Sequence, residues 1–396
     1  MTPQQLVEQL EDLHRGPEAQ LRLVGLGEPA VALLARFLLG PPGLHAQPRM
    51  LAAEALGLIG GARAVEALAT ALVAGDLATL DPVVRLSEEA VREVMARELG
   101  RLGGPAAVAP LLEALQRFHL VEAGIALARR GERRAVPLLV DGLEDPFRRE
   151  RIGAALLEFG PLAVDALIGS LGQLRTLDGQ EGRPSVERRA ASARLLGEIG
   201  EPRAGPALWE RLSDEARDVR VAAALALAGL GPGRNAVALV PPLLEGARSE
   251  SASVADECAA ALVEMGAEAT PAVASALSEE ADRAGARGEA MPPPGLHRLA
   301  RVLGALGDAG LAVLVSLSHD ARPLVRGLAV AHLGQAPATI LDTVLGAATH
   351  DPDSRVRRTA EGVRRVTGGR TTPAPPRWSR TVRRRWDAVL KRLGHG

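Results

Sequence analysis

Histidine is the residue type in this chain that could carry metal chemistry, and none of the eight histidines is followed by glutamate. Two precede an aspartate instead, in His319-Asp320 and His350-Asp351, and the two pairs are 31 residues apart. Equivalent positions on stacked helices lie about 8 to 10 Å apart, whereas two nitrogens bound to one zinc ion each lie about 2 Å from it. We therefore predict a loop or capping role for these pairs and no metal ligand.

Other catalytic patterns are missing from the sequence. It contains no Ser, His and Asp set at recognisable spacing, no Gly-x-x-x-x-Gly-Lys-Ser/Thr motif, and no segment that reads as a strand. The single cysteine, Cys258, opens the apolar run 258–262, which indicates a buried thiol, excludes an intramolecular disulfide and favours a reducing compartment. The sequence predicts no catalytic residue and no cofactor.

The composition favours an architecture of helices that grows by repetition. The chain has 396 residues, more than one compact core usually accommodates. Apolar residues make up 47% of it, but aromatics only 2%, and there is no tyrosine. Ala, Leu and Val must therefore build the core, and side chains of this size suit helices packed closely in layers.

A pattern of about 30 residues recurs along the chain: an Ala/Leu-rich first helix, a glycine, a few residues and an apolar second helix. Residues 53–68 and 193–208 show it most clearly. A helical hairpin of this kind cannot bury its apolar stripe alone, so successive hairpins must stack. We predict that the recurring glycines take the left-handed conformation that ends the first helix. These turn glycines are Gly60, Gly103, Gly131, Gly160, Gly200, Gly231, Gly266 and Gly307.

Three connections between a second helix and the next first helix carry extra Gly/Pro-rich or polar residues, at 75–87, 172–186 and 278–296. A shorter Pro-rich connection lies at 40–49. We expect all of them along one edge, with the second helices on the concave side. Loops on a rigid scaffold often carry recognition. Tolerated sequence drift explains these insertions equally well, and the sequence leaves both readings open.

First helices often open with an acidic residue followed by an arginine. The acid can cap free amides at the positive helix end, and the arginine can reach a carboxylate in the neighbouring repeat. We predict structural roles for these residues, as caps and rungs of a stacked ladder. They are Asp145, Arg148, Asp218, Arg220, Asp320, Arg326, Asp353 and Arg355.

The segment from Asp218-Val219-Arg220 to Leu230-Gly231 resembles the HEAT repeat of the phycobilisome-lyase type, and 353–366 resembles it more weakly. The resemblance implies an all-α, right-handed superhelix of about ten helix pairs over residues 20–366, preceded by a helical cap at 1–19. Proteins with similar repeats include scaffolds, bilin lyases, a di-iron hydroxylase and DNA-repair proteins. The resemblance therefore implies the fold and leaves the function open.

Charge and composition separate these functions. Residues 367–396 hold seven Arg and one Lys against one Asp, or +7, so the remaining residues sum to -8 in a chain of net charge -1. An acidic body disfavours binding to a phosphate backbone. The scarcity of aromatics disfavours a tetrapyrrole, and the hydroxylase resemblance implies His-Glu pairs that this chain lacks.

The tail divides into a Pro/Gly-rich linker at 367–376 and a basic amphipathic helix at 377–396. The helix could cap the end of the solenoid, lie on an anionic membrane, or bind nucleic acid or an acidic protein. Its candidate contact residues are Trp378, Val382, Arg383, Arg384, Arg385, Trp386, Leu390, Lys391 and Arg392.

The combined interpretation is a non-catalytic scaffold that binds a protein through its concave face and loop edge. A HEAT-like enzyme of the lyase or metal-dependent hydroxylase kind is the alternative, as is a peripheral membrane adaptor. No apolar stretch approaches the roughly 20 residues needed to span a bilayer, so we expect a cytoplasmic protein, with peripheral contact at the inner membrane as the variant. The ratio of 46 Arg to one Lys is typical of a GC-rich bacterial genome.

Overall fold

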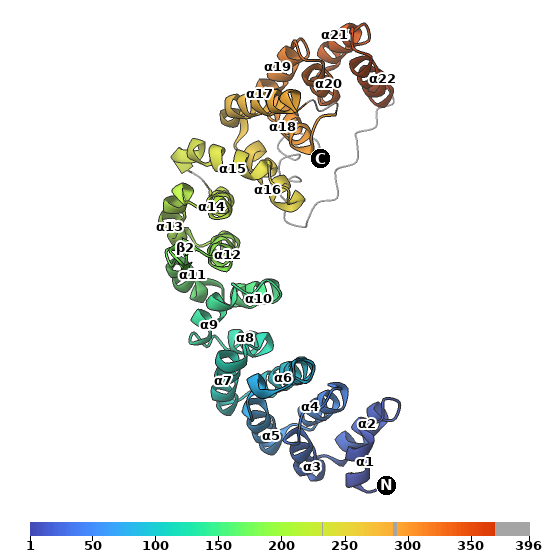
Figure 1. Ribbon diagram of the computed structural model, residues 1–396, viewed down its shortest axis with the longest axis vertical. Coiled ribbons are helices and arrows are strands. Elements are labelled where there is room, and N and C mark those ends of the chain that lie inside the picture. Colours follow the sequence, from blue (N-terminus) through green and yellow to red (C-terminus); the bar gives the residue numbers. More distant parts are fainter. Residues whose placement is uncertain (232, 288–290, 369–396) are drawn as a thin grey trace. The chain divides into compact units, whose positions relative to one another are not determined.

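The computed structural model describes residues 1–231, 233–287 and 291–368. These residues are almost entirely helical, which confirms the predicted all-α class (Figure 1). The chain divides into two units, Met1–Ala204 and Gly205–Gly396. From α2 onward, even-numbered helices are the first helices of the repeat and odd-numbered helices are the second helices.

Unit 1 is a stack of helical hairpins with one small β-ribbon. Its helices are α1 (Pro3–Gln9), α2 (Gly16–Leu26), α3 (Glu28–Leu38), α4 (Gln47–Ile59), α5 (Gly61–Val73), α6 (Pro82–Leu102), α7 (Val108–Phe118), α8 (Val121–Ala128), α9 (Ala135–Gly142), α10 (Arg149–Phe159), α11 (Val164–Leu171) and α12 (Arg183–Ile199). Short 3-10 turns are η1 (Leu77–Thr79), η2 (Pro105–Ala107), η3 (Gly160–Ala163) and η4 (Pro202–Ala204). The ribbon pairs β1 (Thr176–Leu177) with β2 (Gln180–Glu181) in antiparallel register.

Unit 2 repeats the same hairpin. Its helices are α13 (Gly205–Glu210), α14 (Arg217–Leu230), α15 (Val240–Ala247), α16 (Ala252–Glu264), α17 (Thr270–Ala286), α18 (Pro294–Ala305), α19 (Gly307–Leu317), α20 (Pro323–Ala331), α21 (Ala338–Ala348) and α22 (Ser354–Gly368). Its 3-10 turns are η5 (Arg211–Ser213), η6 (Gly233–Leu239) and η7 (Gly266–Ala269).

The eight turn glycines all have a positive φ, between 53° and 93°. Their backbone is not always the left-handed helical one that we predicted. Gly60 has φ 70° and ψ -164°, whereas Gly200 has φ 79° and ψ 16°. The first combination is essentially restricted to glycine, because a side chain would clash with the backbone there. It is needed because the next helix starts at the following residue, so the chain must turn without an intervening loop.

The first helices of unit 1 lie on the inner side of its curve and the second helices on the outer side (Figure 1). This arrangement corrects the expectation that second helices line the concave side. First helices are rich in buried alanine and contact one another more extensively than second helices do. At Gly100 in α6, an added Cβ would lie 2.4 Å from the Cβ of Ala126 in α8. Small residues let neighbouring first helices approach each other closely. The side of the stack on which neighbouring helices are closer together becomes the inner side of the curve.

The insertions are more regular than the sequence suggested. Residues 75–87 contain η1 and the first turn of a long α6, and 172–186 contain the β-ribbon and the start of α12. That ribbon corrects the interpretation that the chain has no strands. In unit 2, the start of the 278–296 insertion extends α17 to Ala286.

Two predicted boundaries also shift. The cap boundary at residue 19 falls inside α2, and α22 continues through Gly368, two residues into the predicted linker.

One segment, Arg149–Leu171, is apolar and long enough by composition to cross a membrane, contrary to the sequence-based expectation. It is broken at Gly160, where φ is 53°, into α10 and α11, two helices of one hairpin in unit 1.

Candidate protein-binding edge of unit 1

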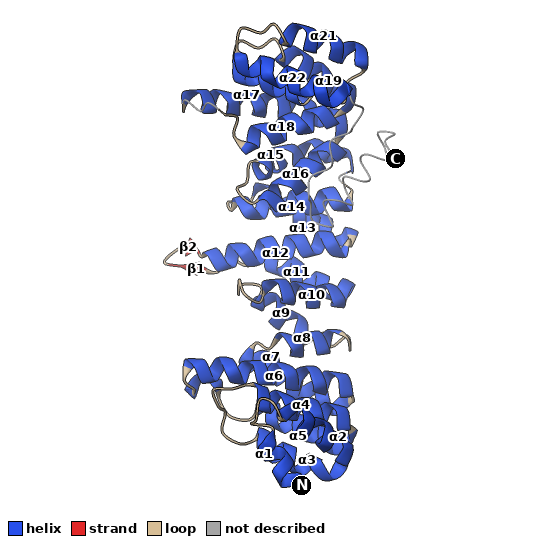
Figure 2. Cartoon of the chain, turned by 90° about the vertical axis from the view of Figure 1, so that its right-hand side faces the viewer, coloured by secondary structure: helices blue, strands red, loops and turns tan. Residues whose placement is uncertain are grey.

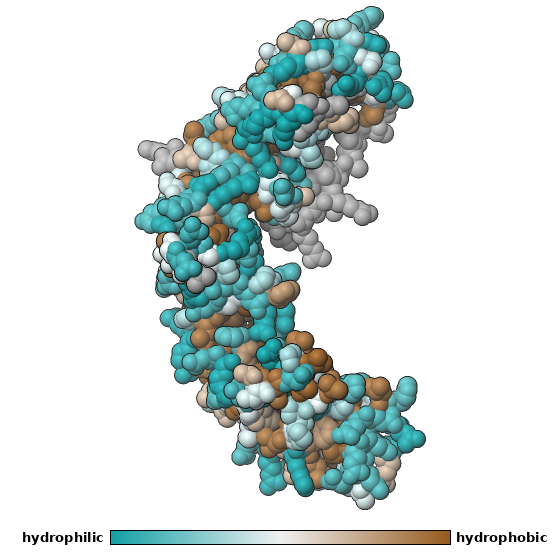
Figure 3. Space-filling model, viewed as in Figure 1, coloured by the Kyte–Doolittle hydropathy of each residue, from teal (hydrophilic) through white to brown (hydrophobic). Residues whose placement is uncertain are grey.

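Four connections of unit 1 lead from a second helix to the next first helix along one side, the left side in Figure 2. They comprise residues 39–46, 74–81, 143–148 and 172–182, and together with residues 82–86 at the start of α6 we call them the connection edge. Three of these connections and the start of α6 expose large apolar side chains, and Figure 3 shows hydrophobic surface among hydrophilic residues in this unit. The exposed residues are Leu39, Leu44, Val83, Leu86, Phe147 and Leu174.

The first two connections are held by a buried charge cluster. Arg49 of α4 donates to the carbonyl oxygens of Leu38 (2.7 Å) and Gly40 (2.6 Å), and it pairs with Glu88 of α6 at 3.1 Å. Arg92 of α6 also pairs with Glu88, at 3.2 Å, and donates to the carbonyl oxygen of Ala74 in the second connection. One buried carboxylate thus joins two arginines, each of which fixes the end of a second helix.

Aromatic contact and burial act on the same cluster. The guanidinium carbon of Arg92 lies 4.3 Å from the centroid of the Phe118 ring, and that of Arg117 lies 4.7 Å from it. Arg117 donates to the carbonyl oxygens of Val73 and Gly75 as well. Burial lowers the pKa of Arg92, because the charged form loses its hydration. A guanidinium that is buried, stacked and paired in this way fixes the backbone to which it donates, at Ala74.

The third connection presents Phe147, whose exposed fraction of 95% exceeds that of every other large apolar residue in the described parts of the chain. Its amide donates to the Oδ1 atom of Asp145 at 2.9 Å. Arg149 donates to the carbonyl oxygens of Leu143 (2.7 Å) and Glu144 (3.3 Å). The backbone that leads to Phe147 is therefore held, while its side chain is left in solvent.

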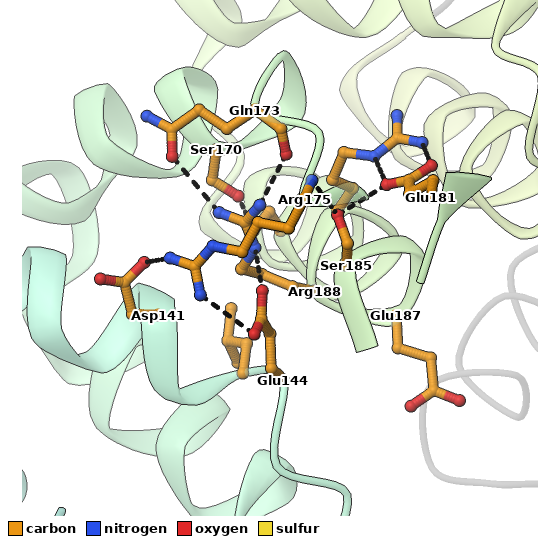
Figure 4. Close-up of polar contacts among 12 residues, drawn as sticks. Asp141, Glu144, Ser170, Gln173, Arg175, Glu181, Ser185, Glu187 and Arg188 are labelled. Atoms are coloured by element: carbon orange, nitrogen blue, oxygen red, sulfur yellow. Dashed lines mark hydrogen bonds and ion pairs between the residues drawn. The ribbon is translucent and has the colours of Figure 1, made fainter. Parts of the chain in front are cut away.

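The β-ribbon of the fourth connection rests on two buried arginines of α12 (Figure 4). Arg189 donates to both oxygens of Glu181, whose Oε1 atom also accepts from Ser185 at 2.7 Å. Arg188 donates to the carbonyl oxygen of Gln173 at 2.6 Å and pairs with Glu144 at 3.1 Å. Burial is the main reason that the pKa of Arg188 is lowered.

Arg175 ties the ribbon to the previous hairpin. It pairs with Asp141 of α9 at 2.5 Å and with Glu144 at 3.0 Å (Figure 4). The turn of the ribbon is Asp178-Gly179, with φ of 52° and 79° at the two residues. Two residues with positive φ form the type of tight turn that matches strand twist. The 172–186 insertion is therefore a built element and not a loose loop.

The inner face of unit 1 is different, because its charges pair with one another. Arg151 of α10 pairs with Glu122 of α8 at 2.9 Å and with Glu93 of α6 at 3.5 Å. Glu93 also accepts from the amides of Val121 (3.1 Å) and Glu122 (2.8 Å), and so caps α8 from a neighbouring helix. Burial raises the pKa of Glu93, although these hydrogen bonds and Arg151 act in the opposite direction. This is a ladder across three successive first helices.

The predicted caps and rungs have varied partners. Arg148 pairs with Asp145 at 3.6 Å and reaches Glu89 of α6 at 3.0 Å. In unit 2, Asp353 accepts from the amide of Arg355 at 2.7 Å, and Asp320 pairs with Arg322 at 2.9 Å.

Two arginines depart from the expectation of a rung between repeats. Arg220 pairs with Glu245 at 2.6 Å, and Arg326 pairs with Asp351 at 2.8 Å. Each acid lies at or just beyond the end of the second helix of the same hairpin, because that end folds back beside the start of the first helix.

The His-Asp pairs have local roles. The Nδ1 atom of His319 lies 3.1 Å from the carbonyl oxygen of Val315, and that of His350 lies 3.0 Å from the carbonyl oxygen of Gly346. Each ring thus contacts the last turn of the helix that precedes it. Cys258 is fully buried in α16. The nine candidate contact residues of the C-terminal tail, from Trp378 to Arg392, lie outside the described residues.

A family model matches two of the hairpins in unit 1. The model of the PBS lyase HEAT-like repeat matches residues 48–73, which run from α4 into α5, and 91–117, which run from α6 into α7. The chain contains PBS lyase HEAT-like repeats. Each match starts in a first helix and ends in the second helix of the same hairpin, so the matched repeat and the observed hairpin are the same unit.

Solved structures with similar folds include three of different kinds. Human deoxyhypusine hydroxylase is 21% identical over 77% of this chain and 96% of its own, with a TM-score of 0.23. An engineered protein is 20% identical over 93% of this chain and 99% of its own, with a TM-score of 0.31. The karyopherin Kap121p bound to the SUMO protease Ulp1p is 12% identical over 93% of this chain and 48% of its own, with a TM-score of 0.42.

This chain therefore spans about half the length of the karyopherin. No curated protein sequence matches it. At these identities and TM-scores, the likenesses say nothing about function.

Proposed function

We propose that this chain is a non-catalytic HEAT-repeat scaffold that binds a protein partner through the connection edge of unit 1. The observation that carries the proposal is a set of exposed large apolar side chains on three connections of unit 1 and on the start of α6, with Phe147 exposed to 95%. Contiguous exposed apolar surface on a soluble protein usually marks a site of interaction. Aromatic side chains in such a surface contribute strongly when a partner covers them.

The arginines that hold these connections make this edge suitable for recognition. Arg49, Arg92, Arg149 and Arg188 each donate to carbonyl oxygens at the base of a connection. A connection that is held before binding loses less conformational entropy when the partner arrives. The inner face is less suited to apolar contact, because its charged side chains already pair across the ladder of Glu93, Glu122 and Arg151. It could add polar contacts at the rim.

Site-specific photo-crosslinking tests the proposal directly. A benzophenone amino acid placed at position 147 of the full chain, in cells of the native host, should yield a discrete crosslinked protein. The same probe at Leu21, which is also exposed but lies in α2 away from the edge, is the matched control. The proposal also requires that Leu174→Ser reduce the yield from position 147. Equal crosslinking from both positions, or none from position 147, contradicts it.

A cytoplasmic location is part of this proposal, since a chain with one cysteine gains nothing from an oxidising compartment. Contact between residues 377–396 and an anionic membrane is a separate hypothesis. Flotation of the full chain with phosphatidylserine vesicles, compared with a chain ending at residue 376, tests it. The hypothesis is supported if the full chain floats with the vesicles and the chain ending at residue 376 does not.

A further inference from the structure

Two histidines from different helices of unit 2 meet at their ring nitrogens. The Nδ1 atom of His297 in α18 lies 3.4 Å from the Nε2 atom of His332, which ends α20. The ring centroids are 5.7 Å apart and the rings are inclined by 62°. The two residues are 35 positions apart in sequence and come from successive first helices.

This separation fits two ligands of one metal ion. Imidazole nitrogens bind zinc at about 2.0 to 2.1 Å in a tetrahedral arrangement. Two such nitrogens are then about 3.3 to 3.4 Å apart, which follows from that bond length and the tetrahedral angle. An ion in this position would lie between His297, which is exposed, and His332, which is partly buried. Solvent can therefore reach it, and water can occupy its other positions.

The helices that carry the two histidines lie close together. At Gly304, also in α18, an added Cβ would lie 2.9 Å from the carbonyl oxygen of His332, so the end of α20 lies directly against α18. Arg301 of α18 is a nearby cation that would repel a metal ion. Its guanidinium pairs with Asp256 of α16 at 2.7 Å, which offsets much of that charge.

We propose that His297 and His332 form a binding site for a divalent transition-metal ion, of the zinc or copper class, that joins α18 to α20. The described residues contain no group of three or more His, Cys, Asp or Glu side chains that could hold a metal ion, so the pair is a two-ligand site completed by water. Imidazole nitrogen suits zinc, copper and nickel among such ions.

The test uses the untagged full chain and zinc chloride, followed by isothermal titration calorimetry. The variants are His297→Asn and His332→Gln, because each amide can keep a hydrogen bond in place of the nitrogen concerned while it removes the imidazole. His319→Asn is the matched control, since the Nδ1 atom of that ring lies 3.1 Å from the carbonyl oxygen of Val315 and 3.1 Å from the hydroxyl oxygen of Ser318. We expect the wild type and the control to bind one equivalent of zinc each. We expect both variants, His297→Asn and His332→Gln, to lose this binding.

Thermal unfolding gives an independent reading. An ion that binds only the folded chain raises Tm, so zinc should raise the Tm of the wild type and of His319→Asn but not that of the two variants. His297 is exposed, so its variant should fold normally. Unchanged stoichiometry and unchanged Tm response in His297→Asn would show that the two rings share a hydrogen bond and nothing more.

Discussion

Arg326 and Asp351 form a bidentate ion pair that closes one hairpin of unit 2. The Nε atom of Arg326 lies 2.8 Å from one carboxylate oxygen and its Nη2 atom 2.9 Å from the other, and the side chains are only 13% and 9% exposed. Arg326 also donates to the carbonyl oxygens of Asp320 and Ala321, just before α20. Arg220 makes the same set of contacts with Glu245 and with the carbonyl oxygens of residues 214 and 215. One arginine therefore fixes both ends of its hairpin.

Replacement of Asp351 by asparagine should destabilise unit 2. The change leaves a nearly buried guanidinium without its counter-charge, and breaking such a pair costs about 3 kcal/mol. Urea-induced unfolding followed by circular dichroism measures the loss. The matched control is Glu279→Gln, which breaks an exposed pair with Arg283 in the same unit and should cost less than about 1 kcal/mol. Equal losses in the two variants would mean that Arg326 does not depend on this carboxylate.

The stability of unit 2 should also fall in acid. Hydrogen bonds from Arg326 hold the pKa of Asp351 below its usual range, and those from Arg322 do the same for Asp320. A carboxyl group whose pKa is lower in the folded chain than in the unfolded chain stabilises the fold above its unfolded pKa. That contribution is lost as the pH falls below about 4, towards the folded pKa. Tm measured between pH 7 and pH 3 should therefore drop more steeply for the wild type than for Asp351→Asn.

The hairpins could be predicted from the sequence because their signal is local. Gly60 and Gly200 follow runs of Ala and Leu, and a glycine after such a run ends a helix for reasons of backbone geometry alone. The inner and outer faces could not be predicted, because they depend on how closely Gly100 and Ala126 approach, and these residues belong to different repeats.

The connection edge could not be predicted from the sequence, for a different physical reason. Arginine is normally exposed, and the sequence offers no local sign that Arg49 shares Glu88 with Arg92 across two hairpins. Some signals were present. Asp178-Gly179 is a strong turn dipeptide within a segment that we interpreted as irregular. Phe147 follows Asp145-Pro146 and does not belong to the apolar pattern of either neighbouring helix. Its exposure to solvent could therefore have been predicted from the sequence.

Close approach between first helices predicts an unusual response to alanine. In Gly100→Ala, the new Cβ would lie 2.4 Å from the Cβ of Ala126. Such overpacking costs about 1 to 3 kcal/mol, against a gain in helix propensity of up to about 1 kcal/mol, so we expect net destabilisation. Gly169 in α11 is the control, because an added Cβ there meets nothing within 4 Å. Gly169→Ala should raise the free energy of unfolding by about 0.5 to 1 kcal/mol.

The β-ribbon should depend on its turn residues and not on the fold beneath it. Gly179 has φ 79°, which a β-branched residue adopts only under strain, so Gly179→Val should open the ribbon. Asp178→Asn is the control, since asparagine tolerates the positive φ at that position. Hydrogen exchange measured by mass spectrometry should show faster exchange over residues 175–182 in Gly179→Val only, because the hydrogen bond from the Gly182 amide to the Arg175 carbonyl oxygen is lost. Global stability should change little, because the apolar core of α11 and α12 is untouched. If exchange in the ribbon is the same in both variants, the hydrogen bonds from Arg189 to Glu181 hold the ribbon closed without help from the turn.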